Sequence, residues 1–355
     1  MKIAVLVSGG VDSSVALKLL KDQGHDVTAF YLKIWLEDEL SFLGSCPWEK
    51  DLEYVRAVCK QNNVLLEILN LQKAYKEAII SYTIDEVKAG RTPNPDVLCN
   101  NRIKFGLFLD QIGKEFDKVA TGHYAQLEKQ NGIFKLKISP DPIKDQTYFL
   151  SYLNQEQLSR ALFPIGNLTK AQVRELAKQY NLATKDRKDS QGLCFLGKIK
   201  FADFIKHHLG DRSGPLIEFE TGIKLGEHSG YWYYTIGQRK GVGLSSGPWY
   251  VVSKDSKSNS VFISKNYYSQ DKPRNAFLVD QINWISGCAP QKTNLQVKIR
   301  HGNYLHESSI KINNDKTLSV TLKDRDQGIS SGQFVAFYDG NYCLGSGIII
   351  QELDV

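Results

Sequence analysis

The strongest constraint on the fold is a short glycine-containing loop near the start of the chain, residues 8–13, with the sequence Ser-Gly-Gly-Val-Asp-Ser. An apolar run before it, residues 3–7, predicts a buried parallel strand. Residues 15–20 follow with the apolar spacing of a helix, which is expected to stop at Gly24. A strand that passes into a helix through two glycines presents backbone N–H groups and the helix dipole to an anion. The loop therefore predicts a site for a phosphate or pyrophosphate group.

The residues of this loop narrow the choice of ligand. Ser8 and Ser13 can donate hydroxyl hydrogen bonds, and Asp12 beside phosphates implies a bridging Mg²⁺ ion. The Gly-Lys-Ser/Thr ending of the common ATP-binding loop is absent, and so is the third glycine of a dinucleotide-binding loop. The pattern resembles the pyrophosphate loop of ATP pyrophosphatases, which adenylate a carbonyl oxygen and release pyrophosphate. The alternative is an ordinary turn in which Asp12 and Ser13 cap the helix.

Strands and helices alternate along the first half of the chain. Strands are predicted at residues 26–34, 64–69, 118–124 and 133–138, and helices at residues 51–60, 74–88, 96–116, 154–161 and 170–180. This alternation predicts an α/β fold with an open, mostly parallel sheet and helices on both faces.

Beyond about residue 197 the pattern changes to dense aromatics, frequent glycines and alternating apolar residues. Short strands are predicted at residues 277–282, 295–300, 308–312, 318–322, 334–338 and 347–350, which suggests a small β-barrel. We therefore expect a catalytic domain over residues 1–197, a central domain over 198–275 and a C-terminal barrel over 276–355. The aromatic cluster at residues 231–234 is interpreted as half-buried strand packing, with a base-stacking platform as the alternative.

The bulk composition limits the class of protein. With 42% hydrophobic and 24% charged residues, it is ordinary for a soluble globular protein, and no run approaches a membrane span. The net charge of +6 is compatible with a polyanionic partner. No secretion signal is visible, so we expect a cytoplasmic protein in which a functional cysteine is reactive rather than structural. No Cys-x-x-Cys pair or zinc-spaced histidine cluster occurs among the six cysteines and seven histidines.

Two cysteines stand in contexts that suit chemistry. Asp96 and Cys99 are three residues apart at the start of a predicted helix, where their side chains share one face. The helix N-terminus favours the thiolate, and Asp96 can act as a general base even though its charge opposes ionisation of the thiol. The alternative is a capping Asp and a small buried Cys. Cys194 lies in a polar loop between two glycines, and its distance from Cys99 in space does not follow from the sequence.

Motifs over nearly the whole chain make a resemblance specific. The sequence resembles the tRNA-specific 2-thiouridylase family, whose members replace the 2-oxygen of the wobble uridine of tRNA with sulfur. The motifs occur in order at residues 8–13, 90–100, 120–124, 144–150, 189–197, 235–241, 248–252 and 331–333.

This resemblance implies roles for both cysteines. Cys99 would be the catalytic nucleophile, Cys194 the carrier of a persulfide, and Asp96 the acid–base partner of Cys99. The two cysteines would form a disulfide during turnover. Adenylation turns a poor leaving group, the uridine oxygen, into AMP, which sulfur can displace.

The resemblance also implies the ligand-binding residues, the cofactors ATP and Mg²⁺, and the partners. The ATP site would comprise Leu6, Val7, Ser8, Gly9, Gly10, Val11, Asp12, Ser13, Leu32 and Gly122. The tRNA contacts would comprise Asn94, Pro95, Asp96, His123, Lys144, Asp145, Gln146, Arg300, His301 and Gln333. The expected tRNAs are those for Lys, Glu and Gln, and the expected sulfur donor is a cysteine desulfurase or a sulfur-relay protein, with no membrane partner.

Two other functions fit parts of the sequence. Another adenylating ligase with this loop, such as an amide-forming synthetase, would need ATP but no cysteine. A non-catalytic RNA-binding or sulfur-carrier protein would need no ATP chemistry.

Overall fold

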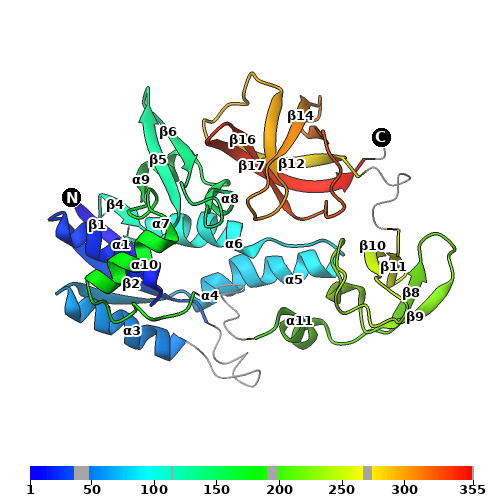
Figure 1. Cartoon of the computed structure of the whole chain (residues 1–355), viewed down its shortest axis with the longest axis horizontal. Coiled ribbons are helices and arrows are strands. Elements are labelled where there is room, and N and C mark those ends of the chain that lie inside the picture. The colour runs from blue at the N-terminus through cyan, green and yellow to red at the C-terminus, as the bar shows by residue number, and fades with distance from the viewer. Residues whose placement is uncertain (36–47, 113–114, 190–198, 267–273, 354–355) are drawn as a thin grey trace.

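We describe residues 1–35, 48–112, 115–189, 199–266 and 274–353 of a computed structural model of the 355-residue chain (Figure 1). The N-terminal part is built on a five-stranded parallel sheet of order β3-β2-β1-β4-β7. Its strands are β1 (Lys2–Leu6), β2 (Asp26–Lys33), β3 (Leu65–Asn70), β4 (Lys118–Ala120) and β7 (Ala161–Leu162). The predicted α/β fold with an open parallel sheet is confirmed, although the fourth strand is shorter than the predicted 118–124.

Helices cover both faces of this sheet because its central strands β1, β2 and β4 bury apolar side chains on both sides. On one face α1 (Val11–Asp22) and α3 (Trp48–Gln61) pack on β1 and β2, and α10 (Lys170–Gln179) packs beside α1. On the other face lies a continuous helical stretch of α6 (Pro95–Leu98), η3 (Cys99–Leu107) and α7 (Phe108–Ile112). The remaining helices of this part are α4 (Gln72–Tyr75), η2 (Lys76–Ile80), α5 (Ser81–Lys88), α8 (Thr147–Leu150) and α9 (Gln155–Arg160).

Two of the predicted helices contain wider turns than an α-helix. The segments η2 and η3 are π-helical, and η3 begins at Cys99. Gly106 lies within η3, where a Cβ atom would stand 2.7 Å from the carbonyl oxygen of Asn101, five residues earlier. Apolar periodicity locates such helices but does not separate the π from the α hydrogen-bond pattern.

The central part carries a second sheet of order β10-β11-β8-β9. Its elements are α11 (Phe201–Leu209), β8 (Gly214–Glu218), β9 (Lys224–His228), β10 (Tyr250–Asp255) and β11 (Ser260–Ser264). The aromatic cluster forms a 3-10 turn, η4 (Tyr231–Tyr233), so the predicted strand there is wrong, but its side chains pack in the core as expected. The side chain of Tyr231 donates to the Lys88 carbonyl at the end of α5, and so connects the two parts.

The C-terminal strands close into a six-stranded barrel, as predicted. The order is β12-β15-β14-β13-β16-β17, and β17 pairs back with β12. The strands are β12 (Ala276–Trp284), β13 (Asn294–Lys298), β14 (His306–Ile312), β15 (Leu318–Leu322), β16 (Phe334–Asp339) and β17 (Tyr342–Glu352). Their inward side chains form a separate core that includes Phe277, Val297 and Phe337.

A hairpin from the N-terminal part extends the barrel sheet. Strands β5 (Ala125–Gln130) and β6 (Ile133–Ile138) form the hairpin, and β6 pairs with β17 through Tyr342 opposite Lys137 and Cys343 opposite Leu136. Figure 1 shows this hairpin beside the barrel, with the central sheet on the barrel's other side. None of the described helices combines the length and apolar character that a membrane span requires.

Candidate active site

The loop between β1 and α1 has the geometry of an anion site. Gly9 has φ +76°, and a Cβ atom there would lie 2.6 Å from the carbonyl oxygen of Asp51. Ser13 Oγ accepts from the Ser8 amide at 3.2 Å, and Ser14 Oγ donates to the Gly10 carbonyl at 2.8 Å. These bonds fold the loop over the N-terminus of α1, where the first backbone N–H groups have no helical partner.

Other residues predicted for an ATP site surround this loop. Leu6 ends β1, Val7 continues the strand with its amide bonded to the Phe30 carbonyl at 2.9 Å, and Val11 begins α1. Gly122 lies against the start of α1, where a Cβ atom would meet the Ser13 nitrogen at 2.7 Å. Leu32 is near the end of neighbouring strand β2. The carboxyl ends of β1, β2 and β4 therefore bring these predicted residues to one edge of the sheet.

The carboxylate of Asp12 is held by two side chains from other elements. Lys170 Nζ lies 2.7 Å and 2.9 Å from its two oxygens, and the Tyr124 hydroxyl donates to Oδ1 at 2.7 Å. Burial, with Asp12 as the next contributor, raises the pKa of Tyr124 above its ordinary value, so the hydroxyl stays a donor. One carboxylate beside a phosphate loop fits Mg²⁺, which commonly takes its remaining ligands from phosphates and water.

A charged network surrounds the loop, and among its members only Lys144, as a tRNA contact, and Asp12, in the ATP site, were given a role from the sequence. Asp189 accepts from Lys144 at 2.8 Å, lies 2.9 Å from Lys170 Nζ and pairs with Arg174. Arg187 donates to the Gly9 carbonyl at 2.7 Å and pairs with Asp51. Burial would raise the pKa of Asp189, but the hydrogen bonds from Lys144 and Lys170 outweigh it and hold this pKa well below its usual range. No spacing rule links these residues, which come from distant parts of the sequence.

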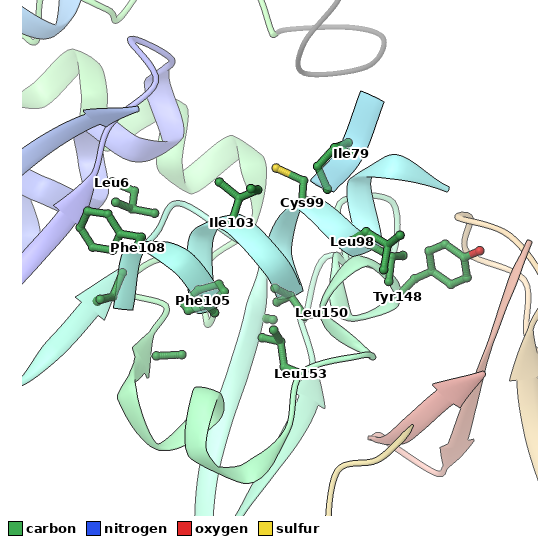
Figure 2. Packing of buried hydrophobic residues seen from close by; sticks show 14 of the residues in the cluster. Leu6, Ile79, Leu98, Cys99, Ile103, Phe105, Phe108, Tyr148, Leu150 and Leu153 are labelled. Carbon is green, nitrogen blue, oxygen red and sulfur yellow. The ribbon is translucent and has the colours of Figure 1, made fainter. Parts of the chain in front are cut away.

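Cys99 lies in the apolar core at the first residue of η3. Figure 2 shows it next to Ile79 of η2 and near Leu98 on its own helix. The side chain is 2% exposed. Burial raises the pKa of its thiol; Asp96 raises it further, while Lys104 and a hydrogen bond with Tyr75 lower it. The expected helix-terminus activation is therefore overridden by desolvation in this conformation.

Asn94 connects the Cys99 helix to the barrel. It caps α6 by accepting from the Val97 amide at 3.4 Å, and Pro95 occupies the first helical turn. Its amide nitrogen lies 3.1 Å from the Tyr148 hydroxyl and 3.5 Å from Gln333 Oε1. The structure thus brings together Asn94 and Gln333, two residues predicted for tRNA that are 239 positions apart in sequence.

Three other predicted tRNA residues make internal contacts. His123 is buried, with Nδ1 2.7 Å from Thr121 Oγ1. Asp145 is 3% exposed and forms an ion pair of 2.9 Å with Lys298 of β13. Gln146 accepts from the Tyr124 amide at 3.0 Å. In this conformation the three side chains hydrogen-bond or pair within the protein. A direct contact with tRNA would require them to become more exposed.

The last two predicted tRNA residues follow β13 on the barrel. Arg300 makes a double hydrogen bond to Asp326, at 2.8 Å and 2.6 Å, and the His301 ring lies 4.5 Å from that of Phe149. Arg300 and Gln333 line a cleft of about 500 Å³ between the barrel and residues 235–237 of the central part. Cys194, the predicted persulfide carrier, lies outside the described residues, and so does Cys46.

A parallel sheet with a Ser-Gly-Gly loop at the N-terminus of its first helix defines a nucleotide-binding α/β protein of the ATP pyrophosphatase type. Three family models match in order: a tRNA methyl transferase HUP domain over residues 1–198, a tRNA methyl transferase PRC-barrel domain over 202–265, and an aminomethyltransferase β-barrel domain over 274–349.

Full-length relatives give the particular family. The chain is 44% identical to the tRNA-specific 2-thiouridylase MnmA of Parabacteroides distasonis, over 99% of each chain. It is 43% identical to tRNA-specific 2-thiouridylase MnmA 1 of Bacteroides thetaiotaomicron, over 99% of this chain and 100% of that one. The chain therefore belongs to the tRNA-specific 2-thiouridylase family.

Proposed function

We propose that this protein catalyses ATP-dependent thiolation of carbon 2 of the wobble uridine in tRNA. The observation that carries the proposal is the match to 2-thiouridylases over 99% of this chain and at least 99% of theirs. The loop at residues 8–13 and the Asp96–Cys99 helix, both in the part of the chain built on the parallel sheet, would supply the pyrophosphate site and one of the two cysteines that the reaction needs.

The first step activates the base. The uridine 2-oxygen attacks the α-phosphorus of ATP, the bond to pyrophosphate breaks, and pyrophosphate leaves on the N-terminus of α1. Asp12 is the residue that would hold Mg²⁺, which offsets phosphate charge when it is bound. Lys144, Lys170, Arg174 and Arg187 add positive charge around the loop.

The second step replaces oxygen with sulfur. The terminal sulfur of a persulfide on Cys194 attacks carbon 2, and AMP leaves with the former 2-oxygen. The Cys99 thiolate then attacks the Cys194 sulfur, which breaks the sulfur–sulfur bond, releases 2-thiouridine and leaves a disulfide between Cys99 and Cys194. A thiol reductant returns that disulfide to two thiols, and a sulfur-donor protein reloads Cys194. Asp96 is the proposed proton acceptor for Cys99.

This chemistry requires the Cys99 helix to move. A thiol that is 2% exposed, with a raised pKa, is a poor nucleophile where it lies. Asn94 and Gln333 link the start of this helix to the barrel, so tRNA bound across that junction can displace it. The proposed tRNA contacts are Asn94, Pro95, Lys144, Arg300, His301 and Gln333, while His123, Asp145 and Gln146 would support that surface from inside. The proposed substrates are the tRNAs for Lys, Glu and Gln.

The decisive experiment separates the two steps with purified protein, tRNA, ATP and a persulfide donor. The wild type is expected to release pyrophosphate only with tRNA and to form 2-thiouridine. Cys194→Ser should still release pyrophosphate but form no 2-thiouridine, while Asp12→Ala should do neither. Cys288→Ser, at an exposed position on the barrel, is the matched cysteine control and should behave as the wild type. Full activity of a Cys99→Ser variant would instead favour an adenylating ligase that needs no cysteine.

A further inference from the structure

Lys170 occupies the position of a cation at the pyrophosphate loop. Its ammonium lies within 2.9 Å of both oxygens of Asp12 and of one oxygen of Asp189. The lysine side chain is 14% exposed, so these contacts lie partly shielded from water, where charge–charge interactions are stronger. A single ammonium thus bridges two carboxylates that would otherwise repel each other.

The local fold directs Lys170 to this position. Lys170 begins α10, whose N-terminus has a complete capping box between Thr169 and Gln172. The Lys170 amide donates to Asp141 Oδ2 at 2.9 Å, which fixes the backbone at the first residue of the helix. Because α10 packs beside α1, the side chain reaches across to the loop at residues 8–13.

The two carboxylates depend on Lys170 to different degrees. Asp189 also accepts from Lys144 and pairs with Arg174, so it keeps positive partners if the ammonium leaves. From the described residues, Asp12 accepts one further hydrogen bond, from the neutral Tyr124 hydroxyl. Removal of the ammonium therefore leaves Asp12 with an uncompensated charge, which a divalent cation can neutralise.

We propose that Lys170 is an exchangeable counter-ion of the nucleotide site. Without nucleotide it neutralises Asp12; when the metal-bound nucleotide enters, the divalent cation takes Asp12 and the ammonium moves to the phosphates. This inference rests on the proposed ATP-dependent function. A lysine side chain can make this exchange because its charge is compact and its stem is flexible. It would leave Asp12 when the divalent cation binds, because two cations on one carboxylate repel each other.

The inference predicts opposite changes in two binding constants for Lys170→Met. Mn²⁺ alone should bind more tightly than to the wild type, because its competitor on Asp12 is gone. Inorganic pyrophosphate with excess Mg²⁺ should bind about tenfold more weakly, because one charge-assisted hydrogen bond is lost. Isothermal titration calorimetry measures both on the full chain, with no tRNA or sulfur donor present.

Two further variants make the result interpretable. Lys170→Arg keeps the positive charge and should recover most of the pyrophosphate affinity. Lys18→Met removes a lysine that pairs with Asp22 on the same helix α1, away from the loop, and should leave both constants unchanged. A Lys170→Met protein in which both affinities fall together, or neither changes, would overturn the exchange. If the wild-type protein from the same preparation thiolates tRNA, overturning the exchange leaves the proposed function unaffected.

Discussion

The Asp145 carboxylate and the Lys298 ammonium form an enclosed ion pair between the parallel-sheet part of the chain and the barrel. Their charged atoms lie 2.9 Å apart, and the side chains are 3% and 4% exposed. Asp145 also accepts from the Thr147 hydroxyl at 2.8 Å and the Ser139 amide at 3.1 Å. The carboxylate is therefore well solvated by the protein itself, and it fixes the barrel against the segment that leads to α8.

Breaking one side of this pair should destabilise the protein strongly. Asp145→Asn leaves the Lys298 charge buried without a counter-charge, and we expect a loss of about 3–5 kcal/mol in the free energy of unfolding. The double variant Asp145→Asn with Lys298→Met should recover part of this loss, because no orphan charge remains. Urea unfolding followed by fluorescence measures both. Lys292→Met, which breaks an exposed pair with Asp339, is the control and should change stability by less than about 0.5 kcal/mol.

The Cys99 thiol should resist alkylation until substrates bind. Its burial and raised pKa keep the thiolate fraction low at pH 7.5, so we expect Cys99 to react with iodoacetamide at least ~100-fold more slowly than exposed Cys288. ATP and tRNA together should raise its rate, while Cys343, which is buried in the barrel sheet with a pKa raised to about 12, should stay protected. Peptide mass spectrometry reads each site separately. Rapid labelling of Cys99 without substrates would contradict the enclosed position.

His123 should make stability depend on pH. Burial, together with the Lys104 charge, lowers the pKa of His123 well below 6.5 in the folded protein. Below about pH 6.5 the imidazole of His123 takes up a proton in the unfolded chain but stays neutral in the folded protein. The free energy of unfolding should therefore fall as the pH drops below about 6.5, until the pH reaches the pKa of His123 in the folded protein.

His123 should contribute up to about 1.4 kcal/mol per pH unit to the slope of the free energy of unfolding against pH. His123→Gln should remove this slope between pH 6.5 and 5.5, whatever its effect on stability at neutral pH. His207→Gln, at an exposed position on α11, should leave the slope unchanged. Equal slopes for His123→Gln and the wild type would mean that folding does not lower the pKa of His123.

Local patterns were enough to predict the main architecture. Apolar runs and turn residues located all six barrel strands and the first three strands of the parallel sheet. The barrel strands, β1 and β2 each bury at least one face in a core, whereas β3 packs only Leu66 and Leu69 partly against the sheet's two cores. The β6–β17 pairing was not predictable, since it joins residues about 200 positions apart and no local signal encodes its register.

The part of the candidate site whose functional groups lie in one continuous motif was predictable from the sequence. Residues 8–13 carry their glycines, hydroxyls and carboxylate in a single loop, and the loop forms as expected. The counter-charges on Asp12 and Asp189 come from Lys144, Lys170 and Arg174, which only tertiary packing brings together. Likewise, the burial of Cys99 depends on Ile79 from another helix, so the sequence predicted a helix terminus but not its desolvation.

Strand β17 has a consequence for how the chain matures during synthesis. It pairs with β16, β12 and β6, so these last residues complete both the barrel and the sheet edge of the β5–β6 hairpin. Until β17 has been synthesised, β12 and β6 lack this shared partner, and the contact between Asn94 and Gln333 has no closed barrel behind it. Synthesis runs from the N-terminus, so the parallel sheet and its loop at residues 8–13 can fold before β17 closes the barrel. The order of synthesis thus separates formation of the loop from formation of the junction between Asn94 and Gln333.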